Sequence, residues 1–341
     1  AYPYLGAALR NIGVEVYIYD ACVGNENDNL DDFFKKSKLL PSGMVQTGVT
    51  DQRILEMVKN YDVIGITSIF SQQEAQVLRC ARLIKTHFPE KKIFSGGVNA
   101  KSRPQQFFDA GVDMIFTSES EITIQEVIKI MQKKSDDFSS IGKIIYKDKS
   151  GKILDNTHFG DIIMDLDKLP IPAWDLLPNE RYWKIGRPHG GSKTIASKEL
   201  KYASMMTSRG CPFACSFCHI ADETEKSISG AIGRFRIKSD ERVQKEFTIL
   251  KNDIGVKQVF IEDDSLFGKK RRAIRLLKSL VGYGLELLDV NGVNTIHLVK
   301  KSGKPGWMVP DEELIELLAE VGFTDLCLPF ETASLRIMKK W

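Results

Sequence analysis

The sequence has no long hydrophobic run. No apolar stretch approaches the roughly 18 residues of a membrane span, so we expect no such span. It also lacks clustered lysine and arginine with interleaved aromatic residues, and with a net charge of only +3 we expect no nucleic-acid binding. Cysteine is scarce. Six cysteines in 341 residues, three of them clustered, do not suit a disulfide framework, so we expect a cytoplasmic protein.

What is present is an ordinary globular composition, 43% hydrophobic and 27% charged, in a chain long enough for two domains. Two regions alternate strand and helix patterns, which predicts an α/β fold with parallel sheets. The basic run 269–272 is expected to be the solvated start of a helix. The predicted strands lie at 14–19, 62–68, 92–95, 113–117, 202–208, 256–261, 285–290 and 324–330, with a hairpin over 141–154.

These regions define the predicted domains. Residues 1–135 are predicted to form a Rossmann-like, doubly wound parallel sheet, and residues 201–341 the strand–helix units of a partial (β/α) barrel. Between them, residues 136–200 comprise the hairpin and a linker rich in Pro, Gly and Ser that includes 188–191. The chain starts inside a helix pattern without methionine and stops just after a strand. We therefore expect a fragment truncated at both ends, without the first strand of the first domain or the last strands of the barrel.

Ligands of open α/β sheets bind beyond the carboxyl ends of the strands. In the first domain these ends carry Thr67 and Ser68 on one strand and Gly96 and Gly97 on the next. Glycine at such a position allows a ligand to approach the backbone closely. The alternative is an ordinary turn of a doubly wound fold.

Three cysteines lie within eight residues, in the stretch Cys211-Pro-Phe-Ala-Cys215-Ser-Phe-Cys218. This spacing can place three thiolates on three irons of a [4Fe–4S] cluster and leave the fourth iron open for a small molecule. A zinc site that adds His219 is the main alternative. It is disfavoured because Cys218 and His219 are adjacent and no second ligand pair lies nearby. Three unrelated buried cysteines are the other alternative.

The cysteine spacing, with Phe217 before the last cysteine, resembles the signature of radical S-adenosylmethionine (SAM) enzymes, as do the surrounding segments 207–213, 235–239 and 261–264. The resemblance implies a radical SAM barrel in which SAM binds the open iron through its amine and carboxylate. It also implies that a polar segment after the second barrel strand holds the ammonium group. The residues at that place are Glu262, Asp263 and Asp264, for which a solvated acidic loop is the alternative.

The same resemblance implies further SAM contacts. Glu331, in a segment similar to the family's Glu-Ser-Gly-Ser, is expected near the ribose and the substrate, and Asn291 is expected to face the site from the end of the third strand. Phe217 and His219 are expected to flank the adenine, although His219 can equally be a hydrogen-bonding loop residue.

The first domain resembles the cobalamin-binding domain that is fused to many radical SAM enzymes, in the segments 5–16, 62–67, 96–100 and 118–121. The resemblance implies that Thr67, Ser68, Gly96 and Gly97 contact the corrin or its nucleotide tail. The segment Asp20-Ala-Cys22 is superficially similar to the cobalamin motif Asp-x-His-x-x-Gly, but it follows the second strand of the fold instead of the first. We expect the true motif before Ala1.

The resemblance implies an enzyme that cleaves SAM reductively to a 5′-deoxyadenosyl radical. Its leading function is cobalamin-dependent methyl transfer to an unactivated carbon or remodelling of a carbon skeleton. A flavodoxin or ferredoxin would supply the electron, and the substrate, a small molecule or a peptide, is not specified. A second hypothesis is a radical SAM enzyme whose first domain binds no cobalamin, such as an oxidative cyclase or a peptide-modifying enzyme. A third is a non-enzymatic iron–sulfur or zinc protein.

Overall fold

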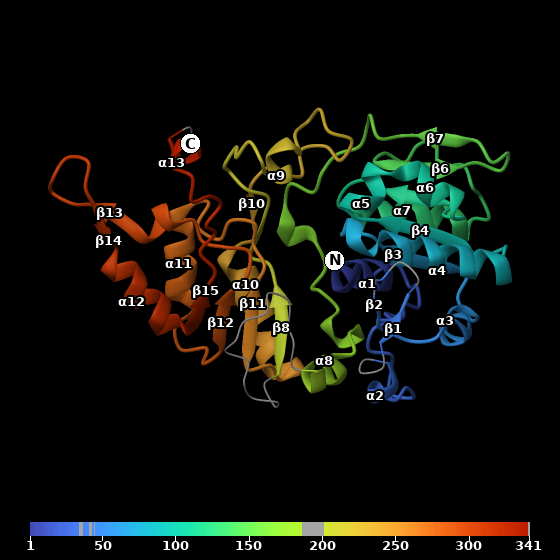
Figure 1. Ribbon diagram of the computed structural model, residues 1–341, viewed down its shortest axis with the longest axis horizontal. Coiled ribbons are helices and arrows are strands. Elements are labelled where there is room, and N and C mark those ends of the chain that lie inside the picture. Colours follow the sequence, from blue (N-terminus) through green and yellow to red (C-terminus); the bar gives the residue numbers. More distant parts are fainter. Residues whose placement is uncertain (34–36, 41–42, 44, 186–200, 340–341) are drawn as a thin grey trace. The chain divides into compact units, whose positions relative to one another are not determined.

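The computed structural model describes residues 1–33, 37–40, 43, 45–185 and 201–339. The chain forms two compact units (Figure 1). The first contains Ala1–Met164, Leu169–Arg181 and Glu223–Ile232, and the second contains Asp165–Lys168, Tyr182–Asp222 and Gly233–Trp341. The part of the predicted linker at 188–191 lies outside the described residues. The predicted domain boundaries remain predictions.

The first unit is built on a five-stranded sheet that runs in the order β3-β4-β5-β6-β7. β3, β4 and β5 are parallel, and β6 and β7 form the predicted antiparallel hairpin at one edge. The bounds are β3 (Val63–Thr67), β4 (Lys92–Gly96), β5 (Met114–Phe116), β6 (Ile144–Lys147) and β7 (Ile153–Asp155).

Helices cover both faces of this sheet, as a doubly wound fold requires. Alternate strand residues separate the two cores: Ile93 and Ile115 pack with Ile84 on one face, whereas Phe94 packs with Val127 on the other. The first face carries α3 (Asp51–Val58), α4 (Glu74–His87) and α6 (Pro104–Asp109), and the second carries α1 (Tyr2–Arg10) and α7 (Glu121–Gln132).

The strand predicted at 14–19 is wrong, because this segment joins no sheet among the described residues. Its contacts are made by side chains. The Tyr17 ring stacks on Tyr19 and on Tyr61, with centroids 6.4 and 6.1 Å apart. The apolar alternation that suggested a strand therefore reflects side-chain packing along an extended segment.

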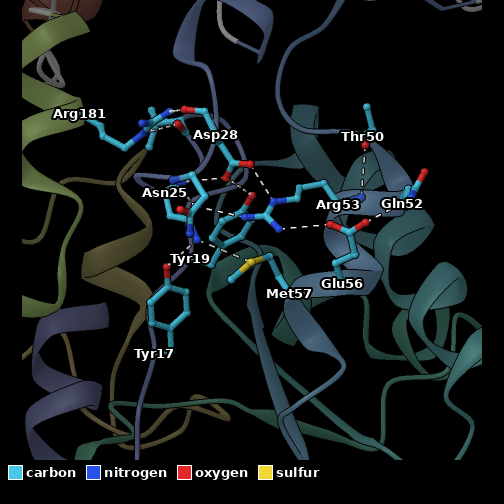
Figure 2. Close-up of polar contacts among 12 residues, drawn as sticks. Tyr17, Tyr19, Asn25, Asp28, Thr50, Gln52, Arg53, Glu56, Met57 and Arg181 are labelled. Atoms are coloured by element: carbon cyan, nitrogen blue, oxygen red, sulfur yellow. Dashed lines mark hydrogen bonds and ion pairs between the residues drawn. The ribbon is translucent and has the colours of Figure 1, made fainter.

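A polar network ties this segment to α3 (Figure 2). Arg53 Nε donates to Asp28 Oδ1 at 2.7 Å, and the Tyr19 hydroxyl donates to Asp28 Oδ2 at 3.0 Å. Arg181 Nε adds a bond to the Val23 carbonyl at 2.6 Å. Burial acts to raise the pKa of Asp28, but hydrogen bonds from the Asn25 N–H, Arg53 and Tyr19 outweigh it and lower this pKa.

The second unit contains a four-stranded sheet in the order β15-β12-β11-β8, and all of its strands are parallel. The α/β class and the parallel arrangement are confirmed, and closure into a partial barrel remains a prediction. The bounds are β8 (Tyr202–Met205), β11 (Gln258–Ile261), β12 (Glu286–Asp289) and β15 (Phe323–Leu326), connected through α10 (Asp240–Ile249), α11 (Lys270–Leu280) and α12 (Glu312–Val321).

Local sequence explains where these helices begin and end. Ser239 caps α10, since its hydroxyl accepts a hydrogen bond from Arg242 N at 3.0 Å. α12 ends at Gly322, which has φ +110° and lies so close to the Leu285 carbonyl oxygen that a side chain would clash. Glycine is therefore required where α12 turns into β15.

Among the described residues, no helix is both long and apolar enough to cross a lipid bilayer. Several shorter elements complete the described part of the chain. The sequence did not predict the hairpin that follows β12. It consists of β13 (Val299–Lys301) and β14 (Met308–Pro310), preceded by the 3-10 turn η5 (Thr295–Leu298). The other short elements include α2 (Leu30–Phe33), β1 (Lys38–Leu39), β2 (Val45–Gln46), α5 (Val98–Ser102), α8 (Asn179–Ile185), β9 (Ser208–Arg209), α9 (His219–Asp222), β10 (Arg236–Ile237) and α13 (Leu335–Met338).

Candidate functional site

The cysteine loop, residues 211–218, follows the short strand β9. Cys211 N donates to the Gly233 carbonyl at 3.0 Å. Gly210 has φ +74°, and a Cβ there would lie 2.6 Å from the Gly233 oxygen and closer still to the Arg234 oxygen. Only glycine fits this position, so the loop begins in tight backbone contact with residues 233–234.

The three thiols differ in exposure. Cys215 is exposed, whereas Cys211 and Cys218 are half-buried, and Cys218 N donates to the Cys215 carbonyl at 3.0 Å. Burial raises the pKa of Cys211. Hydrogen bonds from the Phe213 N–H and the Ser265 hydroxyl oppose this, and the Asp264 charge adds to it. Since a metal ligand must be a thiolate, these two donors are suited to stabilise the deprotonated sulfur.

Among the described residues, no group of three or more His, Cys, Asp or Glu side chains is arranged to hold a single metal ion. A [4Fe–4S] cluster does not need such an arrangement, because each cysteine ligates a different iron. The donor set of the loop, three thiols on one turn, fits three irons of a cluster in number and type.

The three acidic residues after β11 lie in different environments. Asp263 is completely buried, and its carboxylate accepts hydrogen bonds from Thr207 N, Thr207 Oγ1 and Ser208 Oγ, each at 2.6 Å. It therefore fastens the end of β8 to the end of β11. Its expected contact with the SAM ammonium group stays a prediction.

Asp264 and Glu262 are both half-buried. Asp264 Oδ2 accepts a hydrogen bond at 3.0 Å from Gly210 N, directly before the first cysteine. Burial raises the pKa of Asp264, and the Gly210 bond lowers it. The Glu262 carbonyl accepts from Asn291 Nδ2 at 2.9 Å, which joins the ends of β11 and β12.

The remaining expected SAM contacts are exposed side chains. Phe217 is 52% exposed, His219 is exposed at the first position of α9, and Glu331 is exposed after β15. Nothing in the structure tests their expected contacts with SAM.

Asp289 and Arg272 are among the buried charged residues of this unit that the sequence analysis missed. Asp289, at the end of β12, is 3% exposed; its Oδ2 accepts from Gly292 N at 2.9 Å, and its Oδ1 has no hydrogen-bond partner. A carboxylate inside an apolar strand was a signal that could have found it. Arg272 is buried too, and it donates to Thr207 Oγ1 at 2.9 Å. The expectation of a solvated run at 269–272 is wrong for Arg272, which shares a helix face with Leu276 and Leu280.

In the first unit, the carboxyl ends of β3 and β4 lie side by side. Ser68 is buried, its hydroxyl accepts from Asn99 Nδ2 at 3.0 Å, and its carbonyl lies so close to Gly97 that no side chain fits there. Gly97, with φ +102°, is thus required by the neighbouring strand. Thr67 N donates to the Tyr2 hydroxyl at 3.3 Å, and Gly96 has no comparably close neighbour.

Large apolar side chains are exposed at this same edge. Ile69 and Phe70 follow β3, Val98 follows β4, and they are 47%, 48% and 37% exposed. A Cβ on Gly97 would lie 3.3 Å from Ile69 Cγ1, which shows that the Ile69 side chain is a neighbour of the glycine turn. An exposed apolar surface at a strand edge is suited to one face of a large flat ligand.

The neighbouring end of β5 is covered by the segment Glu223–Ile232. Lys101 forms a buried ion pair with Glu223 and donates to Ser229 Oγ at 2.5 Å. Ser118 Oγ donates to the Ser229 carbonyl at 2.7 Å. Among the strand ends of this sheet, the apolar surface therefore lies at β3 and β4.

Comparison with known protein families gives a match for the C-terminal part of the chain. Residues 205–341 match the family model of the Radical SAM superfamily. These residues form a radical SAM domain. The cysteine loop and the three strand ends that follow it all lie within this domain.

The whole chain is similar to larger proteins. It is 25% identical to cytidylyl-2-hydroxyethylphosphonate methyltransferase of Streptomyces wedmorensis, over 99% of this chain and 62% of the relative. It is 23% identical to the cobalamin-dependent radical SAM methyltransferase TokK of Streptomyces tokunonensis, over 67% of this chain and 31% of TokK. The fold is similar to that of TsrM from Kitasatospora setae, with a TM-score of 0.65, 16% identity, and coverage of 100% of this chain and 58% of TsrM. The chain thus spans less than two thirds of the length of these relatives.

Proposed function

We propose that this chain is the SAM-cleaving and cobalamin-binding part of a radical SAM enzyme, and that the enzyme is a methyltransferase. The observation that carries the proposal is the turn of three cysteines within the radical SAM domain. Two relatives that align with both units are methyltransferases by name. TsrM, which has a similar fold, has been solved with cobalamin and a [4Fe–4S] cluster bound.

Each cofactor has a place that fits it. Cys211, Cys215 and Cys218 would hold the cluster. Among the strand ends of the first unit, the surface of Ile69, Phe70 and Val98 suits the corrin, and Thr67, Ser68, Gly96 and Gly97 shape the backbone beneath it. When bound, the cluster supplies one electron that breaks a carbon–sulfur bond of SAM and so yields the 5′-deoxyadenosyl radical.

The side chains of the chain bind and orient. Asp264 holds the start of the cysteine loop through its hydrogen bond from Gly210 N. Glu262 is also half-buried, and it is proposed to receive the SAM ammonium group. Phe217, His219, Asn291 and Glu331 are proposed to contact the adenosine, in a partial barrel. A flavodoxin or ferredoxin is the proposed donor, the substrate is a small molecule or a peptide, and the proposed location is the cytoplasm.

SAM cleavage tests this function. The protein is purified and reconstituted with iron and sulfide without oxygen, and 5′-deoxyadenosine is measured after addition of SAM and dithionite. We expect a [4Fe–4S] cluster and cleavage, both lost in Cys215→Ala. Cys80→Ala is the matched control, because Cys80 lies outside the loop and burial raises its pKa to about 11. One zinc per chain without iron would favour a non-enzymatic metal protein instead.

Corrin absorbance tests the cobalamin part separately. We expect the protein to retain cobalamin after gel filtration, and Phe70→Ser with Val98→Ser to lose it while the cluster stays. Val281→Ser is the control, since Val281 is equally exposed, at 37%, but lies in the second unit. Cleavage of SAM without retention of cobalamin would favour a first domain that binds no cobalamin.

A further inference from the structure

The hairpin β13–β14 of the radical SAM domain was not predicted, and its composition is unusual. Residues 297–310 contain three lysines and no acidic residue. Lys300, Lys301 and Lys304 are exposed, and Trp307 beside them is 68% exposed. In Figure 1 the hairpin extends away from α11 and α12. The hairpin thus exposes three lysines and a large aromatic ring.

The base of this hairpin touches the cysteine loop. His297 lies in η5, directly before β13. The centroid of its ring is 5.6 Å from that of Phe213 and 6.0 Å from that of the buried Phe267. Lys270 fixes the base, since its Nζ donates to the His297 carbonyl and to Asp311 Oδ2, both at 2.7 Å. The hairpin is therefore anchored next to the proposed cluster ligands.

A second basic segment also packs on the cysteine loop. A Cβ on Gly268 would lie 2.9 Å from the Pro212 ring, so the backbone here packs directly on the loop. Lys269 comes next, and it is exposed, as is Arg271. We call Lys269, Arg271, Lys300, Lys301 and Lys304 the basic surface.

Among the described residues, two carboxylates form ion pairs with the basic surface or with Lys270. Asp311 is engaged by Lys270, and Glu313 lies 3.7 Å from Lys300. Against these two carboxylates stand six basic residues, the five of the basic surface and Lys270, so the basic residues outnumber their acidic partners. A net positive surface steers acidic partners toward it and raises their rate of association.

We propose that the basic surface is the docking site of an acidic one-electron carrier protein of the flavodoxin or ferredoxin type. This inference rests on the proposed function, because such a carrier is needed only if the cysteine loop holds a reducible cluster. The carrier is oxidised by one electron, and that electron is consumed when one SAM is cleaved. Electron transfer requires close approach, and both basic segments contact the loop at Pro212 or Phe213. Trp307 supplies the apolar contact that small, transient interfaces use beside charge.

The test compares two sources of electrons. The variant Lys300→Glu/Lys301→Glu/Lys304→Glu is assayed for 5′-deoxyadenosine with dithionite and with a reduced acidic flavodoxin. We expect unchanged cleavage with dithionite and roughly ten-fold more flavodoxin for half-maximal rate, a difference that shrinks at high salt. The matched control is Lys133→Glu/Lys149→Glu/Lys152→Glu, which reverses three exposed charges of the first unit. Trp307→Ala is a second variant. It should weaken the binding of flavodoxin without changing how that binding depends on salt.

Equal flavodoxin requirements in the variant and the control would overturn the docking site. The docking site would also be overturned if the lysines were needed for binding to anionic lipid vesicles or to nucleic acid but their reversal did not change the flavodoxin concentration at half-maximal rate. If the unaltered protein cleaves no SAM even with dithionite, the proposed function fails instead. Direct binding of oxidised flavodoxin to the unaltered protein and to the variant then still decides whether the basic surface docks it.

Discussion

The Asp263 carboxylate accepts hydrogen bonds from both the backbone and the side chain of Thr207. The Thr207 N–H donates to Asp263 Oδ1 and the Thr207 hydroxyl donates to Oδ2, both at 2.6 Å. Arg272 reaches the same hydroxyl at 2.9 Å, so a buried cation and a buried anion share one threonine. This arrangement sets the end of β8, from which the cysteine loop departs.

Asp263→Ala is therefore expected to destabilise the fold. It leaves buried donors unsatisfied and a buried guanidinium without its nearby anion, which costs on the order of 3 kcal/mol in the free energy of unfolding. Denaturant unfolding measures the loss, and Asp253→Ala, at an exposed position, should change stability by less than about 0.5 kcal/mol. A variant of Asp263 that keeps its stability and loses only SAM binding would contradict this structural role and support the contact with SAM expected from the sequence.

The sequence predicted both parallel sheets because short segments with an apolar centre, such as Ile93-Phe94 and Val259-Phe260-Ile261, alternate with helices of clear periodicity. It also located the cysteine loop, since ligand spacing is local. It did not separate Asp263 from Asp264, because the two are adjacent and only the tertiary contact with Thr207 distinguishes them. For the same reason, a run of four basic residues did not reveal that Arg272 faces the core.

Asp28 should make the first unit sensitive to acid. Its pKa is lowered in the folded state, so its contribution to stability is present above its unfolded pKa of about 4 and is lost as pH falls through the folded value. We expect the melting temperature to fall below about pH 4 and Arg53→Met to flatten this fall, since Arg53 donates to Asp28 Oδ1. Arg82→Met, at an exposed position of α4, is the control. An identical acid profile for Arg53→Met would contradict this role.

Asp289 should give stability the opposite pH dependence, because its pKa is raised in the folded state. Burial, and after it the charge of Asp263, raise the pKa of Asp289 to about 7. Its contribution to stability is thus present below about pH 4 and is lost as pH rises toward 7 and above. Asn at this position cannot ionise and can still accept from Gly292 N. Asp289→Asn should therefore raise the free energy of unfolding at pH 8 by on the order of 3 kcal/mol and leave it unchanged at pH 4. A loss of stability at pH 8 would show that the carboxylate has a favourable role there.

The buried pair of Lys101 and Glu223 offers a double-mutant cycle. Both side chains are 9% exposed, so Lys101→Met leaves an unpaired buried carboxylate and should cost about 3 kcal/mol. Lys101→Met/Glu223→Leu replaces both charges with apolar groups and should recover most of that loss, as measured by denaturant unfolding. The exposed pair of Arg10 and Asp175, 2.7 Å apart, is the control, and Arg10→Met should cost less than about 1 kcal/mol. If the double variant were no more stable than Lys101→Met, the charges would not explain the loss, and the contacts that Ser229 and Ser118 make would have to hold this segment on β5.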